Sequence, residues 1–138
     1  MNIKMTHTPI FVLDQDAALD FYVIKLGFEV HTDAMMGPDF RWLTVCSKDA
    51  PGFEIILMKV SKEFMKDDES YNMLKTLVEK GKLGAGVFET NDCRATYEEL
   101  KSKGVEFLSP PEEKFYGIEC VMKDNSGNWF SLTQPAKK

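Results

Sequence analysis

A chain of 138 residues is long enough to bury a sizeable hydrophobic core in one compact body. Its hydrophobic content (43%) and charged content (28%) are typical of a globular protein, and no apolar run approaches the roughly 18 to 20 residues that span a bilayer. A net charge of −5 argues against a nucleic-acid-binding surface. The N-terminus has no signal-peptide pattern, so we expect a cytoplasmic protein without membrane or nucleic-acid partners.

The three cysteines are Cys46, Cys93 and Cys120. Their number is odd, and none of them forms a CxxC pair. This pattern favours buried free thiols in a reducing compartment over disulfides or a cysteine zinc site.

The first half of the chain predicts a strand, a helix and three further strands. The strand over 8–13 is apolar on both faces, so both faces should be covered. Asp14 is a plausible helix N-cap, and Gly27 can end the helix in the left-handed conformation. One helical face is formed by Leu19, Tyr22, Val23 and Leu26. The later strands are expected over 28–31, 41–46 and 53–58.

The second half repeats this order after a charged segment over 62–82, which predicts a connecting helix. A strand begins at Gly84, a helix runs from Asp92 to Gly104, and strands are expected over 105–108, 116–122 and 129–134. The two prolines at 110–111 predict a turn. Two similar strand–helix–strand units indicate two copies of one supersecondary unit that share a core.

Four segments resemble the vicinal oxygen chelate superfamily, which includes glyoxalase I, the bleomycin-resistance proteins and the extradiol dioxygenases. They are HTPIFVLDQDAALDFYVIKLGFEV, FEIILM, VFETNDCRATYEELKSKGVEF and YGIECVMKDNSGNWFSLTQP. The resemblance implies an α+β fold in which two paired βαβββ modules form a cup-shaped half-barrel, often within a homodimer. We therefore expect one domain over 1–138, with module one at about 4–60, a linker helix at about 61–82 and module two at about 83–135. The modules could pair within one chain or between two.

In metal-using members the cup holds a divalent ion, bound by the first and last strands of each module. The resemblance places these positions at His7 and Glu54 in module one, and at Ala85 and Ser131 in module two. Alanine cannot bind a metal and serine is a poor substitute for a carboxylate. Glu89 shares the predicted face of Ala85 but lies roughly 13 Å along the strand. The sequence thus predicts half a metal site and no certain cofactor, with Zn, Ni, Mn or Fe as candidate ions.

Glu54 lies among apolar residues, so it should pair with His7 or a cation such as Arg41, or lie in a wet cleft. His7 and Glu54 are also the candidate catalytic residues, because such a pair can act as a general base and its orienting partner. A lone histidine is more often a neutral pocket residue. We interpret His31, beside two polar residues, as solvated surface.

Two functions remain open. The favoured one is a bleomycin-resistance-like protein that binds a small molecule in an apolar cup, and the alternative is a metal-dependent lyase, isomerase or dioxygenase using His7 and Glu54. Glyoxalase I activity itself is not expected. The same lining could instead simply fill the barrel. The predicted ligand-pocket residues are Phe11, Arg41, Trp42, Ile56, Met58, Val87, Tyr116, Trp129 and Ser131.

Overall fold

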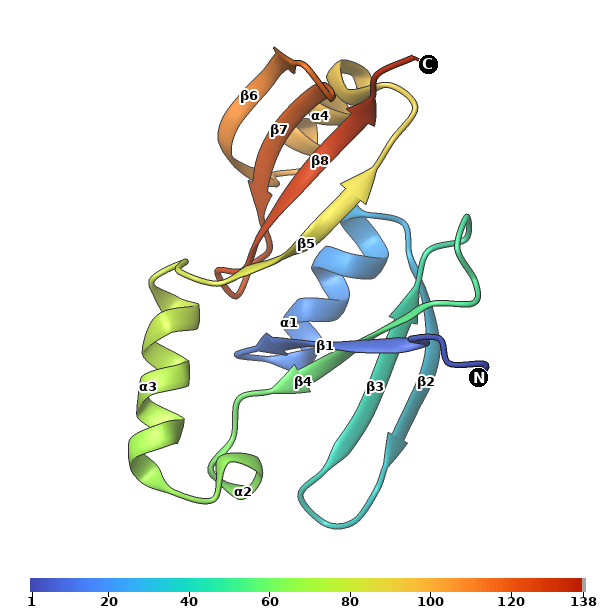
Figure 1. The fold of residues 1–138 in the computed structure, drawn as a ribbon. Coiled ribbons are helices and arrows are strands. Elements are labelled where there is room, and N and C mark those ends of the chain that lie inside the picture. The colour runs from blue at the N-terminus through green and yellow to red at the C-terminus, as the bar shows by residue number, and fades with distance from the viewer. Residues whose placement is uncertain (138) are drawn as a thin grey trace.

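The computed structural model describes residues 1–137 and contains two four-stranded sheets, each with a helix from its own unit (Figure 1). The first sheet has the order β1-β4-β3-β2, in which β1 and β4 are parallel and the other neighbours are antiparallel. Its unit comprises β1 (His7–Val12), α1 (Gln15–Leu19), η1 (Asp20–Lys25), β2 (Glu29–Met35), β3 (Arg41–Cys46) and β4 (Glu54–Lys59).

The second sheet repeats this arrangement in the order β5-β8-β7-β6, again with one parallel pair. Its unit comprises β5 (Gly84–Glu89), α4 (Cys93–Ser102), β6 (Glu106–Lys114), β7 (Gly117–Lys123) and β8 (Trp129–Pro135). The repeated α+β unit is therefore confirmed. The two sheets are separate and do not close into one barrel (Figure 1).

The first helix of each unit begins and ends where the sequence predicts. The carboxylates of Asp14 and Asp92 accept hydrogen bonds from backbone N–H groups of the first turn, at 2.9 and 3.0 Å. Gly27 and Gly104 follow the helices with φ of +77° and +90°, a conformation that glycine adopts without a steric cost.

The first helix is not regular, which the sequence did not indicate. Residues 20–25 form the π-helical segment η1, in which the N–H of Leu26 donates to the carbonyl of Phe21. The wider turn lets the adjacent side chains of Phe21 and Tyr22 both enter the core, with 1% and 0% exposure. The predicted helical stripe included Tyr22 but missed Phe21.

The connecting segment forms two helices rather than one, α2 (Lys62–Met65) and α3 (Asp68–Glu79). Lys66 adopts a left-handed conformation with φ of 69°, which ends α2. The side chain of Asp67 then accepts a hydrogen bond from the N–H of Ser70 at 2.7 Å and begins α3.

The turn predicted at the two prolines 110–111 is wrong. Both residues lie inside β6, which is an edge strand of the second sheet. The pairing of β6 with β7 shifts register on either side of Ser109. An edge strand tolerates proline because one side of its backbone has no ladder to join.

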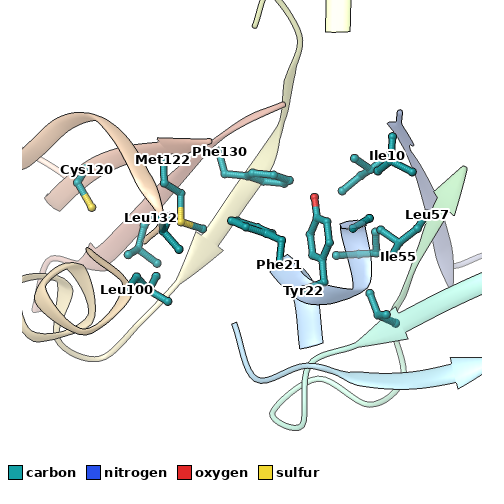
Figure 2. Packing of buried hydrophobic residues seen from close by; sticks show 14 of the residues in the cluster. Ile10, Phe21, Tyr22, Ile55, Leu57, Leu100, Cys120, Met122, Phe130 and Leu132 are labelled. Atoms are coloured by element: carbon teal, nitrogen blue, oxygen red, sulfur yellow. The ribbon is translucent and has the colours of Figure 1, made fainter. Parts of the chain in front are cut away.

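The hydrophobic core lies between the two units (Figure 2). Phe21 and Tyr22 of η1 stand between Phe130 of the second sheet and Ile10 and Leu57 of the first. Burial therefore joins both units in one body, and burial together with the carboxylate of Asp124 raises the pKa of Tyr22 well above its usual value.

The turn between β7 and β8 binds the second unit to the first. Asp124 Oδ1 accepts hydrogen bonds from three successive backbone N–H groups, and its Oδ2 accepts one from the hydroxyl of Tyr22 at 2.8 Å. The amide of Asn128 also donates to the carbonyl of Phe11 at the end of β1, at 2.7 Å. This network satisfies the buried polar groups of the turn.

The three cysteines are free and buried, as predicted. Burial raises the pKa of the Cys120 thiol to about 12, so its reactive thiolate is scarce. Within residues 1–137, no helix is long and apolar enough to cross a membrane.

Candidate functional site

The first sheet has one face toward the core and an opposite face that we call its open face. Alternation along the strands puts Ile10, Val12, Leu43 and Leu57 on the core side. The open face carries the predicted pair and its neighbours: His7, Phe11, Trp42, Thr44, Glu54, Ile56 and Met58.

His7 and Glu54 meet on this open face. They stand opposite each other in the parallel register of β1 and β4, and His7 Nε2 lies 3.1 Å from Glu54 Oε2. The hydroxyl of Thr6 is 2.8 Å from His7 Nδ1 and holds the other side of the ring. The predicted pairing of Glu54 with His7 is therefore confirmed, and the Glu54 side chain is only 14% exposed.

His31 is exposed, as predicted, but its side chain also reaches Glu54, a contact that the sequence did not indicate. Its Nδ1 lies 3.0 Å from Glu54 Oε1, although half of its side chain remains exposed. Strand β2 pairs Val30 with Val45 and then Thr32 with Thr44, which leaves His31 as the extra residue of a β-bulge. Sequence reasoning missed this contact because it relied on the polar neighbours of His31 and gave no sign of the bulge.

Thr44 is a further residue of the cluster that the sequence did not reveal. Its fully buried hydroxyl donates to Glu54 Oε1 at 2.7 Å and accepts from the N–H of Thr32 at 3.1 Å. One carboxylate is thus held by a hydroxyl and flanked by both histidines of the chain.

Arg41, the other proposed partner of Glu54, binds different carboxylates. Its guanidinium donates to both oxygens of Asp33 at 2.8 and 2.9 Å and to Asp16 at 2.8 Å. These hydrogen bonds raise the pKa of Arg41 and lower that of Asp33. Among residues 1–137, the ion-pair partners of Glu54 are therefore two imidazoles and no permanent cation.

A cavity of about 690 Å³ lies beside the open face. It is bounded by the segment 35–41, by α2 and by the end of β4, and two predicted pocket residues, Arg41 and Met58, line it. The ring of Phe40 in its wall is 6.3 Å from the ring of Trp42, which is in turn 6.2 Å from His7. Aromatic rings therefore connect the cavity to the polar cluster.

The second sheet presents a different set of residues. A register shift between Gly84 and Gly86 places Val87 opposite Ser131, and Ala85 packs against the core. The family resemblance had matched Ala85 to the position opposite Ser131, and the structure has Val87 there instead. Val87 is 71% exposed and Trp129 is 38% exposed, so this face also presents apolar side chains.

Glu119 is the carboxylate that the sequence missed on the second sheet. The hydroxyls of Ser131 and Tyr116 each donate to it at 2.5 Å, and these bonds, with that from Ser131 the larger cause, lower its pKa. Glu119 lies opposite Thr133 in the second sheet, at the position that Thr44 has opposite Ile56 in the first sheet. In the first sheet the hydroxyl of β3 (Thr44) donates to the carboxylate of β4 (Glu54), whereas in the second sheet the hydroxyl of β8 (Ser131) donates to the carboxylate of β7 (Glu119).

The sequence profile of the Glyoxalase/Bleomycin resistance protein/Dioxygenase superfamily matches residues 4–132. The chain belongs to this superfamily. It is similar to protein YetH of Bacillus subtilis (strain 168), with 36% identity over 125 residues that cover 91% of this chain and 92% of that protein. It is also 36% identical to protein YurT of the same organism over 133 residues, which cover 96% of this chain and 99% of that one.

Two solved structures share the whole fold. UcmS2 is 45% identical with a TM-score of 0.91, covering 97% of this chain and 99% of its own. TnmS3, an antibiotic binding protein from Streptomyces sp. CB03234, is 27% identical with a TM-score of 0.77, covering 99% of both chains.

The residues present do not fit the divalent metal centre implied by some members of the superfamily. His7 and His31 approach different oxygens of Glu54, and the second sheet offers Val87 and Ser131. Throughout the described range 1–137, no three His, Cys, Asp or Glu side chains are grouped so that they could hold a metal ion. A catalytic zinc normally needs three protein ligands, and harder ions need six or more donors.

Proposed function

We propose that this superfamily member binds a small organic molecule at the open face of the first sheet and does not transform it. The observation that carries the proposal is the cavity of about 690 Å³ joined by Trp42 to the cluster of His7, Glu54 and His31. Pockets for drug-sized ligands have about 300–1,000 Å³, apolar walls and a few placed polar groups.

The chemistry of the wall supports a hydrophobic ligand. Met35, Met36 and Met58 line the cavity together with Phe40 and Phe64. Flexible thioethers adapt to irregular molecules and contact aromatic rings favourably. The whole-chain likeness to TnmS3, an antibiotic binding protein, supports the same class of function.

The alternative function, a metal-dependent lyase, isomerase or dioxygenase, would require ligands that Val87 and Ser131 cannot supply. We expect titration with nickel, zinc, manganese and iron to give no stoichiometric binding to the untagged protein. Stoichiometric binding that disappears in Glu54→Gln would contradict this expectation and restore the metalloenzyme.

A homodimer would complete the cup. The exposed Val87 and Trp129 of the second sheet are suited to cover the open face of the first sheet in a second copy. A dimer in light scattering at micromolar concentration supports this arrangement, and a monomer under the same conditions contradicts it. The buried free thiols suit the reducing cytoplasm, where we place the protein.

The binding proposal is tested with the neutral aromatic probe 2-(1-naphthyl)ethanol and two-dimensional NMR. We expect amide shifts at 35–41 and in α2. Asp39→Trp places an indole at the wall of the cavity and should weaken binding at least about tenfold. Asp49→Trp, also in an exposed loop but away from this cavity, is the control and should change affinity less than about twofold. Absence of binding, or equal losses in both variants, would overturn the proposal.

A further inference from the structure

Both histidines of the chain lie beside the carboxylate of Glu54, and a β-bulge in β2 brings His31 to it. His31 is the unpaired extra residue of β2, and its Nδ1 lies 3.0 Å from Glu54 Oε1. Bulges are frequent beside functional sites because they redirect one side chain without moving the rest of the strand. Without this extra residue, the alternation of β2 would place His31 differently relative to Glu54.

The charge at this cluster is negative when the imidazoles are neutral. Thr44 contributes a hydroxyl and no charge, and the guanidinium of Arg41 forms ion pairs with Asp16 and Asp33 instead of Glu54. The Glu54 side chain is 14% exposed, which leaves it accessible but largely shielded from water. A shielded carboxylate attracts an ammonium group more strongly than a fully solvated one does.

The aromatic neighbours favour the same kind of ligand. His7 contacts Glu54 directly and its ring is 6.2 Å from the indole of Trp42, so an aromatic side chain adjoins the immediate neighbour of a cation bound at Glu54. Trp is the best side chain for cation–π contacts. Phe40 lines the cavity, so an aromatic ring of the ligand bound there would lie next to Phe40, while its amine would point toward Glu54.

We propose that Glu54 binds the protonated amine of an aromatic ligand and that His31 is the positioning residue that gives the site its preference for an amine. This inference rests on the proposed function and adds the chemical class of the ligand. His31 acts through Glu54: with Thr44 it holds Oε1, which directs the other oxygen, Oε2, toward the ligand together with His7.

Three probes that differ in charge and share one ring system test the proposal: 2-(1-naphthyl)ethylamine, 2-(1-naphthyl)ethanol and 3-(1-naphthyl)propanoate. NMR titrations are run at pH 8, above the ordinary titration range of histidine. We expect the amine to bind the native protein at least about tenfold more tightly than the alcohol, and the carboxylate to bind most weakly. Glu54→Gln should abolish this preference, whereas Glu98→Gln, an exposed residue on α4 with the same charge change, should preserve it.

The role of His31 is tested separately from that of Glu54. His31→Ala should reduce the amine-to-alcohol ratio to below about threefold and change alcohol affinity less than about twofold. His31→Asn should restore part of the ratio, because Asn Nδ2 is as many bonds from Cα as His Nδ1. A purely structural role would weaken all three probes equally, and that result would overturn the assignment of His31.

Failure of the inference and failure of the proposed function give different results. If the amine and the alcohol bind the native protein equally well with the same shifts, the preference for an amine is refuted and the binding function stands. If a preference for the amine survives in Glu54→Gln, the cation binds elsewhere and the inference is wrong. If none of the three probes binds, both are refuted.

Discussion

The hydroxyl of Tyr22 offers a direct test of how the two units are held together. Tyr22 is fully buried in the core and donates to Asp124, which accepts five hydrogen bonds in all. Tyr22→Phe keeps the ring and removes only this donor. A hydrogen bond to a charged group contributes about 1.5–3 kcal/mol, so we expect the free energy of unfolding to fall by about that amount. For a chain of this length the loss corresponds to roughly 6–12 °C in melting temperature.

The same residue predicts a pH dependence. The pKa of Tyr22 is raised in the folded protein, so its stabilising effect is fully present below the ordinary tyrosine pKa of about 10. This stability is lost as pH rises above 10 toward the raised value, because the unfolded chain then releases the proton first. The stability difference between the native protein and Tyr22→Phe should therefore shrink by up to about 1.4 kcal/mol per pH unit above pH 10.

Urea denaturation at pH 8, 9, 10 and 11, followed by circular dichroism, measures both effects. Tyr97→Phe is the matched control, since the ring of Tyr97 on α4 packs against Phe107 of β6 and its change should stay below about 0.5 kcal/mol. The reasoning is refuted if Tyr22→Phe costs less than about 0.5 kcal/mol, or if its cost is the same at pH 9 and pH 11.

Three further predictions concern single sites. Gly127→Ala should destabilise the protein by more than about 3 kcal/mol in urea denaturation, because φ is +120° and a Cβ would lie 2.1 Å from the carbonyl oxygen of Val78. Gly27→Ala is the control: its φ is +77° but its surroundings are open, so it should cost only about 1 kcal/mol, and equal costs would contradict the steric argument. Thr44→Val should cost about 1–3 kcal/mol by the same measurement, since it leaves Glu54 and a backbone N–H without their hydroxyl partner, and a neutral result would show that these groups find others. The thiol of Cys120 should stay unmodified by dithiobis(nitrobenzoate) in the folded protein and react after denaturation; rapid modification of the native protein would show that its burial is transient.

The features that the sequence predicted depend on neighbours along the chain. Asp14 and Asp92 cap their helices because the acceptor side chain and the donor N–H groups are only three residues apart. The apolar residues of 8–13 correctly indicated a strand, but both of its faces were expected to be covered, and only the face with Ile10 and Val12 is buried in the core. The pairing of His7 with Glu54 was also predictable, because the family resemblance supplied the register that the strands themselves do not reveal.

The features that were missed depend on register shifts. The bulge at His31 and the shift between Gly84 and Gly86 each insert one residue into a strand, and one residue is enough to reverse every later side chain. The sequence reveals neither shift, so it did not indicate the contact of His31 with Glu54 or the position of Val87 opposite Ser131. Glu119 escaped notice because its partner Ser131 lies on another strand, twelve residues away.

The amino-acid sequence alone determined the repeated βαβββ units, their helix caps and the presence of one histidine–glutamate pair, because these follow from short-range geometry and from family resemblance. Tertiary structure alone decided which side chains surround Glu54, how Arg41 is neutralised and where a cavity opens. The physical reason is that the sheet brings β2, β3 and β4 together through hydrogen bonds whose register is set by packing against the core, and only that register places His31 and Thr44 beside the same carboxylate.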